Sequence, residues 1–257
     1  PDLADLPLRP ATSGWDNAMV RLGEHLAVRL PRRAASVELL EHEGRWLPEL
    51  AALGLPLPIP VPVRHGVASA TYPWSWHVVP WFTGTSYVDA PTGTPAAERV
   101  AARALGSFLA ALHRPAPRDS PRNPSRGIPF AERLPITEVH IAQLGPRVVA
   151  RAPHLRDVLD AAAAAPPWSS APRWLHADLH PGNLLVDGGV LAAVVDFGDV
   201  TSGDPATDLA AAWLCVDDPT ARDELRVAAG ADDATWCRAR GWAAALALAH
   251  LAGGGGA

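Results

Sequence analysis

The sequence contains no lysine, and all 22 basic residues among its 257 positions are arginine. Any task that a protein ordinarily gives to a lysine ammonium group must therefore fall to an arginine guanidinium group or be left undone. Cysteine is nearly absent too. Because Cys215 and Cys237 are the only two, the sequence predicts no disulfide framework and favours a reducing compartment such as the cytoplasm.

Long apolar runs are also missing, since none reaches the roughly 18 residues that a membrane span needs. The opening residues, with Asp2 and Asp5, are not the basic segment that begins a signal peptide. The net charge of −5 argues against a nucleic-acid surface and favours a cationic ligand. We therefore expect a small-molecule substrate and neither nucleic acid nor membrane as a partner. A chain of this length can bury the core of one large domain or of two lobes.

The most informative stretch runs from Leu175 to Asp199, LHADLHPGNLLVDGGVLAAVVDFGD. Two apolar segments flank Asp187-Gly188-Gly189, and a turn of this type between apolar segments predicts a β-hairpin over 184–195. A hairpin returns its two ends to one side. The residues just before and just after it should therefore lie close together.

Three polar side chains fall at those ends: Asp178, Asn183 and Asp196. Singly, each is an ordinary turn or cap residue, so the prediction depends on their combination. Three hard oxygen donors that leave room for water and phosphate suit Mg²⁺. They do not suit zinc, which prefers cysteine or several histidines.

The order and spacing of His176-x-Asp178, Asn183 and Asp196-Phe197-Gly198 resemble the catalytic loop and metal-binding triplet of kinases. With the following Gly203-Asp204-Pro205-Ala206-Thr207-Asp208, the pattern resembles the aminoglycoside phosphotransferase family, antibiotic kinases with a protein-kinase-like fold. The resemblance implies an α+β, two-lobed fold. A small β-rich N-lobe over 1–84 would bind nucleotide, and a larger, mostly helical C-lobe over 85–257 would carry catalysis and bind the acceptor.

The resemblance also implies roles. Asp178 is the expected catalytic residue, which orients the acceptor hydroxyl and takes its proton. Asn183 and Asp196 are the expected ligands of Mg²⁺, with ATP or GTP as the phosphoryl donor. His176 and Asp208 are expected to support the catalytic loop.

Ala177 stands where most relatives have glycine. We therefore expect ordinary backbone angles at this position.

The strand predicted over 26–30 places Ala27 and Arg29 on the same face, because strand side chains alternate. By the resemblance, Ala27 lies against adenine, and Arg29 replaces the usual phosphate-anchoring lysine. Arginine can also clamp phosphate oxygens.

A helix is predicted from the cap Ser36 to about Leu53, with Leu39 on its apolar stripe. Glu43 falls on this stripe, and a buried carboxylate needs a partner. The resemblance supplies Arg29 as the partner of Glu43, with Glu38 and Glu41 as the remaining candidates.

The segment Val79–Gly84 resembles the hinge between kinase lobes, where the carbonyl of Pro80 and the amide of Phe82 would meet the adenine edge. Trp81 is interpreted as a packing residue. The turn over 13–17 is either a phosphate-covering loop or a plain hairpin turn.

Helices are predicted over 94–114, 131–144, 154–165 and, in two pieces, 219–252, with Asp204 as the cap of another. The segment 115–129, rich in proline, arginine and serine, is interpreted as a solvated loop. The acidic clusters near residues 217, 223 and 232 are interpreted as solvated helix ends, with contact to substrate ammonium groups as the alternative that the resemblance implies.

The predicted function is transfer of the γ-phosphoryl group of ATP or GTP to a hydroxyl of an aminoglycoside-like antibiotic. Two alternatives stay open. One is a kinase of the same fold for a macrolide or a small metabolite such as an amino alcohol. The other is a catalytically inactive nucleotide-binding regulator, for which the replacement of lysine by Arg29 is the main support.

Overall fold

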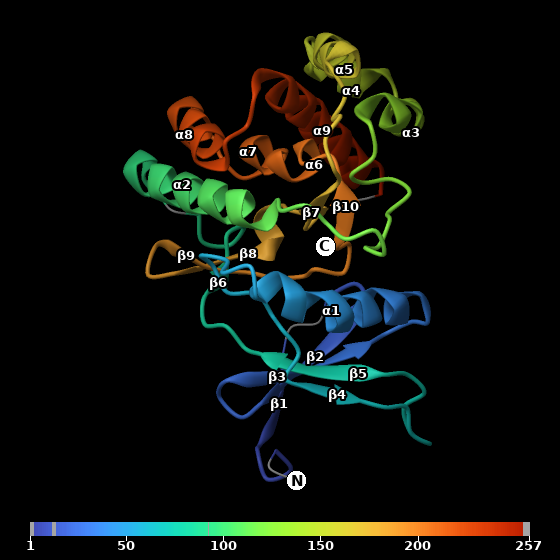
Figure 1. Ribbon diagram of the computed structural model, residues 1–257, viewed down its shortest axis with the longest axis vertical. Helices are drawn as coiled ribbons and strands as arrows, with labels where there is room; N and C mark the ends of the chain where they lie inside the picture. Colours follow the sequence, from blue (N-terminus) through green and yellow to red (C-terminus); the bar gives the residue numbers. More distant parts are fainter. Residues whose placement is uncertain (1–2, 12–13, 92, 254–257) are drawn as a thin grey trace.

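The computed structural model describes residues 3–11, 14–91 and 93–253, with a β-rich N-terminal part and a helical C-terminal part stacked along its long axis (Figure 1). The predicted α+β, kinase-like architecture is therefore observed. In chain order, the elements are β1 (Leu8–Pro10), β2 (Asn17–Leu22), β3 (Leu26–Pro31), α1 (Ala35–Ala51), β4 (Arg64–Gly66), β5 (Trp76–Pro80), β6 (Thr85–Ser86), α2 (Pro95–Leu112), α3 (Phe130–Leu144), α4 (Pro146–Arg151), α5 (Leu155–Ala164), β7 (Arg173–Leu175), the short 3-10 helix η1 (Pro181–Asn183), β8 (Leu184–Asp187), β9 (Val190–Val194), β10 (Thr201–Gly203), α6 (Ala206–Leu209), α7 (Ala211–Leu214), α8 (Pro219–Ala229) and α9 (Asp233–Ala252).

The N-terminal part is an antiparallel sheet in the order β1-β2-β3-β5-β4, and α1 lies between this sheet and the helical part (Figure 1). Successive strands pair as hairpin neighbours except where α1 intervenes between β3 and β4. β5 then enters beside β3, so that Ala27 lies opposite Val79 and Arg29 opposite His77. The buried face of β3 is therefore the face that carries Ala27 and Arg29.

The predicted details of α1 need three corrections. Ser36 does not cap the helix, because Ala34 occupies the cap position and the Ser36 hydroxyl donates to Asp16 Oδ1 at 2.7 Å instead. The buried stripe runs through Leu40 and not Leu39, which is half-buried, and α1 ends at Ala51. A stripe inferred from leucines alone is ambiguous by one position, because Leu39 and Leu40 are adjacent in the sequence.

The C-terminal part is built on α2 and α9, and its elements agree closely with the predicted ranges. Thr94 caps α2 by accepting from the amide of Ala97 at 3.2 Å. The predicted hairpin is β8 and β9, with positive φ at Gly188 and Gly189, as a tight hairpin turn requires. The short helix α4 was not predicted.

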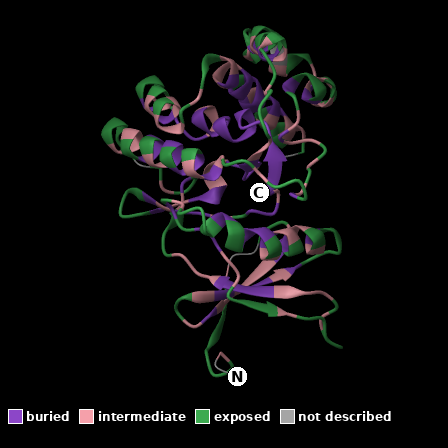
Figure 2. Ribbon diagram, viewed as in Figure 1, coloured by how far each residue is buried: buried purple, intermediate pink, exposed green. Residues whose placement is uncertain are grey.

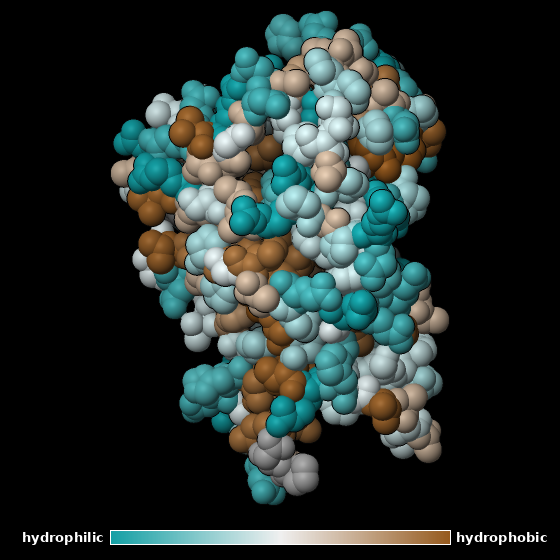
Figure 3. All heavy atoms as spheres, viewed as in Figure 1, coloured by the Kyte–Doolittle hydropathy of each residue, from teal (hydrophilic) through white to brown (hydrophobic). Residues whose placement is uncertain are grey.

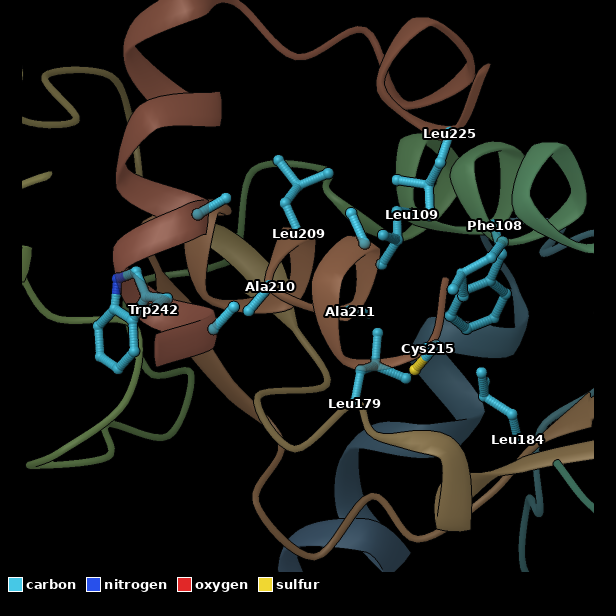
Figure 4. Close-up of a cluster of buried hydrophobic side chains, with 14 of the residues drawn as sticks. Phe108, Leu109, Leu179, Leu184, Leu209, Ala210, Ala211, Cys215, Leu225 and Trp242 are labelled. Atoms are coloured by element: carbon cyan, nitrogen blue, oxygen red, sulfur yellow. The ribbon is translucent and has the colours of Figure 1, made fainter. Parts of the chain in front are cut away.

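The buried side chains form a core that continues from α1 through α2 and the hairpin to α9 (Figure 2). Next to the hairpin, Phe108 and Leu109 of α2 lie close to Leu179, Leu184 and Cys215 (Figure 4). This core holds the loop between β7 and β8 at its middle and at its C-terminal end, because Leu179 and Leu184 belong to it.

The chain crosses between the two parts at residues 81–86. The Trp81 amide still donates to His25 of the N-terminal sheet, at 2.8 Å, whereas β6 already pairs with β8. On the face in Figure 3, hydrophilic residues cover much of both parts, and apolar residues form separate patches. Within the described residues, no helix combines the length and apolar character needed to traverse a membrane.

Candidate active site

Arg29 on β3 bonds to side chains from two other segments, Glu43 on α1 and Asp196, which lies two residues after β9. Its guanidinium group donates through Nη1 to Glu43 on α1, at 2.7 and 2.8 Å to the two carboxylate oxygens, and through Nη2 to Asp196 Oδ1 at 2.7 Å. With its amide oriented so that the oxygen faces Arg29, Asn17 accepts two further hydrogen bonds of 3.0 Å. The structure thus brings together Arg29, Glu43 and Asp196, whereas Glu38 and Glu41 are exposed.

Burial dominates the electrostatics of this cluster. Glu43 is 1% exposed, and burial raises the pKa of its carboxyl group, an effect that the Arg29 guanidinium opposes. Burial alone would lower the pKa of Arg29, but the carboxylates of Glu43 and Asp196 outweigh it and raise that pKa. Arg29 therefore stays charged, with two carboxylates from different elements held against it.

The predicted adenine side lies at the end of β5. Ala27 is fully buried opposite Val79, and Pro80 ends the strand. Within the part of the chain that the structure describes, the Phe82 amide has no hydrogen-bond partner, so it remains a free donor. Trp81 is half-buried, and the Arg21 guanidinium group lies over its ring, 4.5 Å from the ring centroid.

The turn before β2 is held at its C-terminal side by hydrogen bonds from Arg32 and Arg33. Asp16 accepts from the Arg33 guanidinium at 2.6 Å, and Arg32 donates to the Gly14 carbonyl at 3.0 Å. Trp15 between them is 74% exposed. Ser13, the first residue of the predicted phosphate-covering turn, lies outside the described residues.

Asp208 braces the loop that follows β7. Its fully buried carboxylate accepts from the amides of His176 at 2.9 Å and Ala177 at 2.7 Å, and it lies 3.1 Å from His113 Nε2. Bonds from ionised acceptors to backbone amides are stronger than neutral ones. Asp208 therefore fixes the backbone immediately before Asp178.

The expectation of ordinary backbone angles at Ala177 is wrong. Its φ is +68°, in the left-handed region, where a side chain costs about 1–2 kcal/mol. The two amide bonds to Asp208 hold the chain in this conformation. Asp196 is also left-handed, at φ +63°. Strain of this kind is found where surrounding contacts over-determine the backbone, often at functional sites.

His176 lies inside the loop and is fully buried. Its Nδ1 accepts from the amide of Asp178 at 3.2 Å, and its Nε2 lies 2.9 Å from the carbonyl oxygen of Val195. Its ring packs on Phe197 at 4.4 Å. These contacts link the catalytic loop to the segment that carries Asp196, which matches the supporting position expected for His176.

Asn183 lies at the junction of loop and hairpin. Its Nδ2 donates to the backbone carbonyl of Asp178 at 2.9 Å, and its own carbonyl accepts from the Val195 amide at 3.0 Å. Asn183 is thereby linked to the Asp178 backbone and to the residue next to Asp196. The predicted gathering of the hairpin ends is observed.

The donor set fits a magnesium ion that also needs oxygens from substrate and water. Asn183 Oδ1 and Asp196 Oδ2 have no partner within the described residues, so both are uncommitted hard oxygens. Over the same residues, no cluster of three or more His, Cys, Asp and Glu side chains forms a metal cage. Mg²⁺ is commonly held by one or two protein oxygens together with phosphates and water.

Sequence reasoning missed Arg126, which lies in the segment interpreted as a solvated loop. Its Nη1 donates to Asp178 Oδ1 and to the Ala177 carbonyl, each at 2.5 Å, and its Nη2 lies 3.9 Å from Asp199 Oδ2. Burial would raise the pKa of Asp178, but the charge and hydrogen bond of Arg126, together with His180 and His176, outweigh it and lower that pKa. Arg118 and Arg122 in the same loop are exposed, so only part of the segment is solvated.

The segment 115–129 is hydrogen-bonded to the residues that follow β9. Asn123 Nδ2 donates to Asp199 Oδ1 at 2.8 Å, and its amide donates to Thr201 Oγ1 at 2.9 Å. Burial raises the pKa of Asp199, with Arg126 opposing. No pattern in the sequence predicts these hydrogen bonds, because residues 115–129 have neither helical nor strand periodicity.

The predicted cap Asp204 has a different main partner. The helix α6 begins at Ala206, whose amide still donates to Asp204 Oδ1 at 3.0 Å. Both carboxylate oxygens also accept from the buried Arg238 of α9, at 2.7 and 3.1 Å. This buried ion pair fixes α9 against the segment that also holds Asp208.

The acidic clusters of the last helices are largely structural. Asp218 and Asp232 cap α8 and α9, while Glu224 pairs with Arg103 and Asp233 with Arg226. A mainly apolar cavity of about 360 Å³ lies between α5, α7 and α9, and none of the predicted site residues lines it.

Comparison with known proteins identifies related folds. The chain superposes on the GDP and kanamycin complex of APH(2″)-IIIa with a TM-score of 0.75 and 18% identity, covering 96% of this chain and 86% of that one. A macrolide 2′-phosphotransferase from Brachybacterium faecium, MphH, gives 0.65 and 25% identity, with 97% and 89% covered. No curated protein sequence gives a significant match.

A family model gives the decisive match. Residues 7–246, nearly the whole chain, match the model described as the phosphotransferase enzyme family. The matched range includes the loop with Asp178, the hairpin, Asp196 and Asp208. The kanamycin-bound phosphotransferase and MphH share the same overall fold with this chain. The chain therefore belongs to the phosphotransferase enzyme family.

Proposed function

We propose that this phosphotransferase moves the γ-phosphoryl group of ATP or GTP to a hydroxyl group of an aminoglycoside-like antibiotic. The observation that carries the proposal is the junction at which Asn183 links the Asp178 backbone to the residue before Asp196. Structures of the fold have been solved with GDP and kanamycin, and with streptomycin and ATP. These complexes support a purine nucleotide donor and a small-molecule acceptor.

In the proposed reaction, Asp178 accepts a hydrogen bond from the acceptor hydroxyl, aligns its oxygen with the γ-phosphorus and takes the proton. The new O–P bond forms as the bond between the γ-phosphorus and the bridging oxygen breaks. Positioning and electrostatics supply most of the catalysis in such transfers. Asp208 and His176 contribute by holding the loop that carries Asp178.

Asn183 and Asp196 would hold Mg²⁺, which offsets negative charge on the phosphates when it is bound. Arg29, held by Glu43, would anchor phosphate oxygens in the place of the usual lysine. Ala27, the Pro80 carbonyl and the free Phe82 amide would contact adenine or guanine. These roles rest on the arrangement of the side chains and on the resemblance to kinases.

We further propose that residues 1–84 form the nucleotide-binding lobe and 85–257 the catalytic and acceptor-binding lobe. The change of hydrogen-bond partners, from His25 at Trp81 to β8 at Thr85, supports a boundary there. The scarcity of cysteine supports a cytoplasmic location.

A macrolide is the second candidate acceptor. The macrolide 2′-phosphotransferase MphH is 25% identical to this chain, whereas the aminoglycoside phosphotransferase structures compared here reach 15–18%. The net charge of −5 favours the cationic class instead.

The test is a panel assay with the full chain, Mg²⁺ and either ATP or GTP. Kanamycin, gentamicin, streptomycin, a macrolide and a small amino alcohol serve as acceptors, and mass spectrometry detects the gain of one phosphoryl group. Asp178→Asn is the matched control, which should bind nucleotide in a thermal-shift assay yet lose transfer. Mg²⁺-dependent nucleotide binding without transfer to any acceptor would contradict the proposal and favour an inactive nucleotide-binding regulator.

A further inference from the structure

The carboxylate of Asp178 has two oxygens, and the structure treats them differently. Oδ1 accepts from Arg126 Nη1 at 2.5 Å. Oδ2 lies 3.7 Å from His180 Nε2, beyond hydrogen-bond distance, and has no hydrogen-bond partner within the described residues. Oδ2 is therefore the uncommitted oxygen for a hydroxyl group that approaches the loop, whereas Oδ1 already accepts a charge-assisted bond.

Arg126 also fixes the carboxylate relative to its own backbone. The Nη1 that holds Oδ1 donates to the Ala177 carbonyl as well, at 2.5 Å. The Ala177 amide is held by Asp208 at 2.7 Å. One guanidinium group thus connects the side chain of Asp178 to the strained backbone that precedes it, so rotation of the carboxylate would break a charge-assisted bond.

The backbone at Arg126 is held as well. The next residue, Gly127, donates its amide to Thr207 Oγ1 at 3.1 Å, and its carbonyl accepts from the Asp204 amide at 2.9 Å. It passes so close to Gly203 that a Cβ atom built there would lie 1.9 Å from the Gly127 oxygen. These contacts place Arg126 from β10 and α6, independently of Asp178.

A second carboxylate accompanies the guanidinium group. Asp199 Oδ2 lies 3.9 Å from Arg126 Nη2, and its Oδ1 accepts from Asn123 at 2.8 Å. Arg126 therefore lies between Asp178 and Asp199. Its charge remains compensated by Asp199 when the carboxylate of Asp178 hydrogen-bonds to a substrate.

From these contacts we infer that Arg126 is a positioning residue, which occupies Oδ1 of Asp178 and so presents Oδ2 to the acceptor hydroxyl. The inference rests on the proposed function, because it assumes that Asp178 receives the acceptor. A guanidinium group suits this positioning role, because its planar set of N–H donors can contact the Asp178 carboxylate, the Ala177 carbonyl and the Asp199 carboxylate at the same time.

The test compares Arg126→Ala, Arg126→Lys and the matched control Arg122→Ala, an exposed arginine of the same loop. Arg126→Ala should lower kcat about 100-fold, the scale of a catalytic group misplaced by 1 Å, and leave KM for the nucleotide nearly unchanged. Arg126→Lys should recover part of the loss, and Arg122→Ala should resemble the unmodified chain.

Free guanidinium at non-denaturing concentration supplies the readout that a purely structural role would not move. It should raise kcat of Arg126→Ala several-fold and leave Asp178→Ala inactive. Unchanged kcat in Arg126→Ala, or a loss that guanidinium and lysine both fail to restore, would overturn the inference.

A failure of the proposed function is recognised separately, as absence of transfer by the unmodified chain. In that event, crystal structures of the unmodified chain and Arg126→Ala decide the matter through the orientation of the Asp178 carboxylate. The inference requires that the carboxylate rotate, or spread over several conformers, in the variant. An identical, ordered carboxylate in both structures would refute it.

Discussion

Removing the Arg29 guanidinium should destabilise the protein far more than the loss of an ordinary ion pair. Arg29→Met keeps the aliphatic stem and deletes the charge, which leaves Glu43, 1% exposed, without its counter-charge. Breaking a buried pair by deleting one partner costs about 3–5 kcal/mol. Asp196 adds little to this cost, because its side chain is 54% exposed and can be solvated.

The same geometry predicts an asymmetry between the two partners. In Glu43→Met, the guanidinium group keeps Asp196 at 2.7 Å and Asn17 at 3.0 Å, so the cost should fall to about 1–2 kcal/mol, near that of a lost hydrogen bond to a charged group. The double variant should be more stable than Arg29→Met alone, because it no longer buries an unpaired carboxylate.

Equilibrium urea unfolding, followed by tryptophan fluorescence and circular dichroism, measures the free energy of unfolding of each variant. Arg45→Met is the matched control on the exposed side of α1. Its guanidinium group is 60% exposed and 3.6 Å from Asp119, so its loss should cost less than about 1 kcal/mol. A cost below about 1 kcal/mol for Arg29→Met, or a double variant as unstable as the sum of the two single ones, would refute the reasoning.

Three further predictions concern buried residues. Asp208→Asn should lower the free energy of unfolding by about 2–3 kcal/mol, because one of the two side-chain oxygens that accept from backbone amides becomes an NH2 donor. Urea unfolding, together with a measurement of kcat, tests this. Ala177→Val should be clearly less stable than Ala177→Gly, since a β-branched residue at φ +68° is strained, and equal stability of the two would contradict the backbone assignment. Burial lowers the pKa of His77 to about 4 from 6.5, so the unfolded state binds the proton first and stability falls as pH decreases between these values. The unmodified chain should therefore lose about 2 kcal/mol more stability between pH 8 and pH 5 than His77→Gln does. Urea titrations at both pH values measure this difference, and an identical pH dependence of the two proteins would contradict the lowered pKa.

Local patterns predicted much of the fold, because the elements concerned carry their own signals. The Asp187-Gly188-Gly189 turn has the two positive φ values that a tight hairpin needs, and Thr94-Pro95 begins α2 as expected. The spacing of apolar residues located the buried stripe of α1 less precisely. Two adjacent leucines fit the same stripe, and packing against the sheet selected Leu40.

The pairing of Arg29 with Glu43 shows how a local pattern can indicate a tertiary contact. A carboxylate on an otherwise apolar helix stripe must be compensated, and the face of β3 that carries Arg29 proved to be the buried one. Together with the resemblance to kinases, this left few partners to choose from. The third member, Asp196, is 167 residues away, and no local pattern connects it to Arg29.

Arg126 and Ala177 mark the point at which such reasoning fails. Arg126 belongs to an irregular segment whose conformation is set by hydrogen bonds to β10 and α6, and these partners follow it by some 75 to 81 residues. Ala177 seemed to require ordinary angles, because a side chain is disfavoured at positive φ, but two bonds to the buried Asp208 outweigh that cost. In both cases the chain departs from its local preference where a buried polar contact compensates.

These departures surround one side chain. The left-handed backbone of Ala177, the Asp208 brace and the Arg126 bond all act on the position of Asp178. A loop that only connected β7 to β8 would not need a strained residue stabilised by a fully buried carboxylate. Because the strained Ala177 directly precedes Asp178 and the buried Asp208 holds the two amides before it, this backbone strain lies where a phosphoryl-transfer enzyme needs a fixed carboxylate.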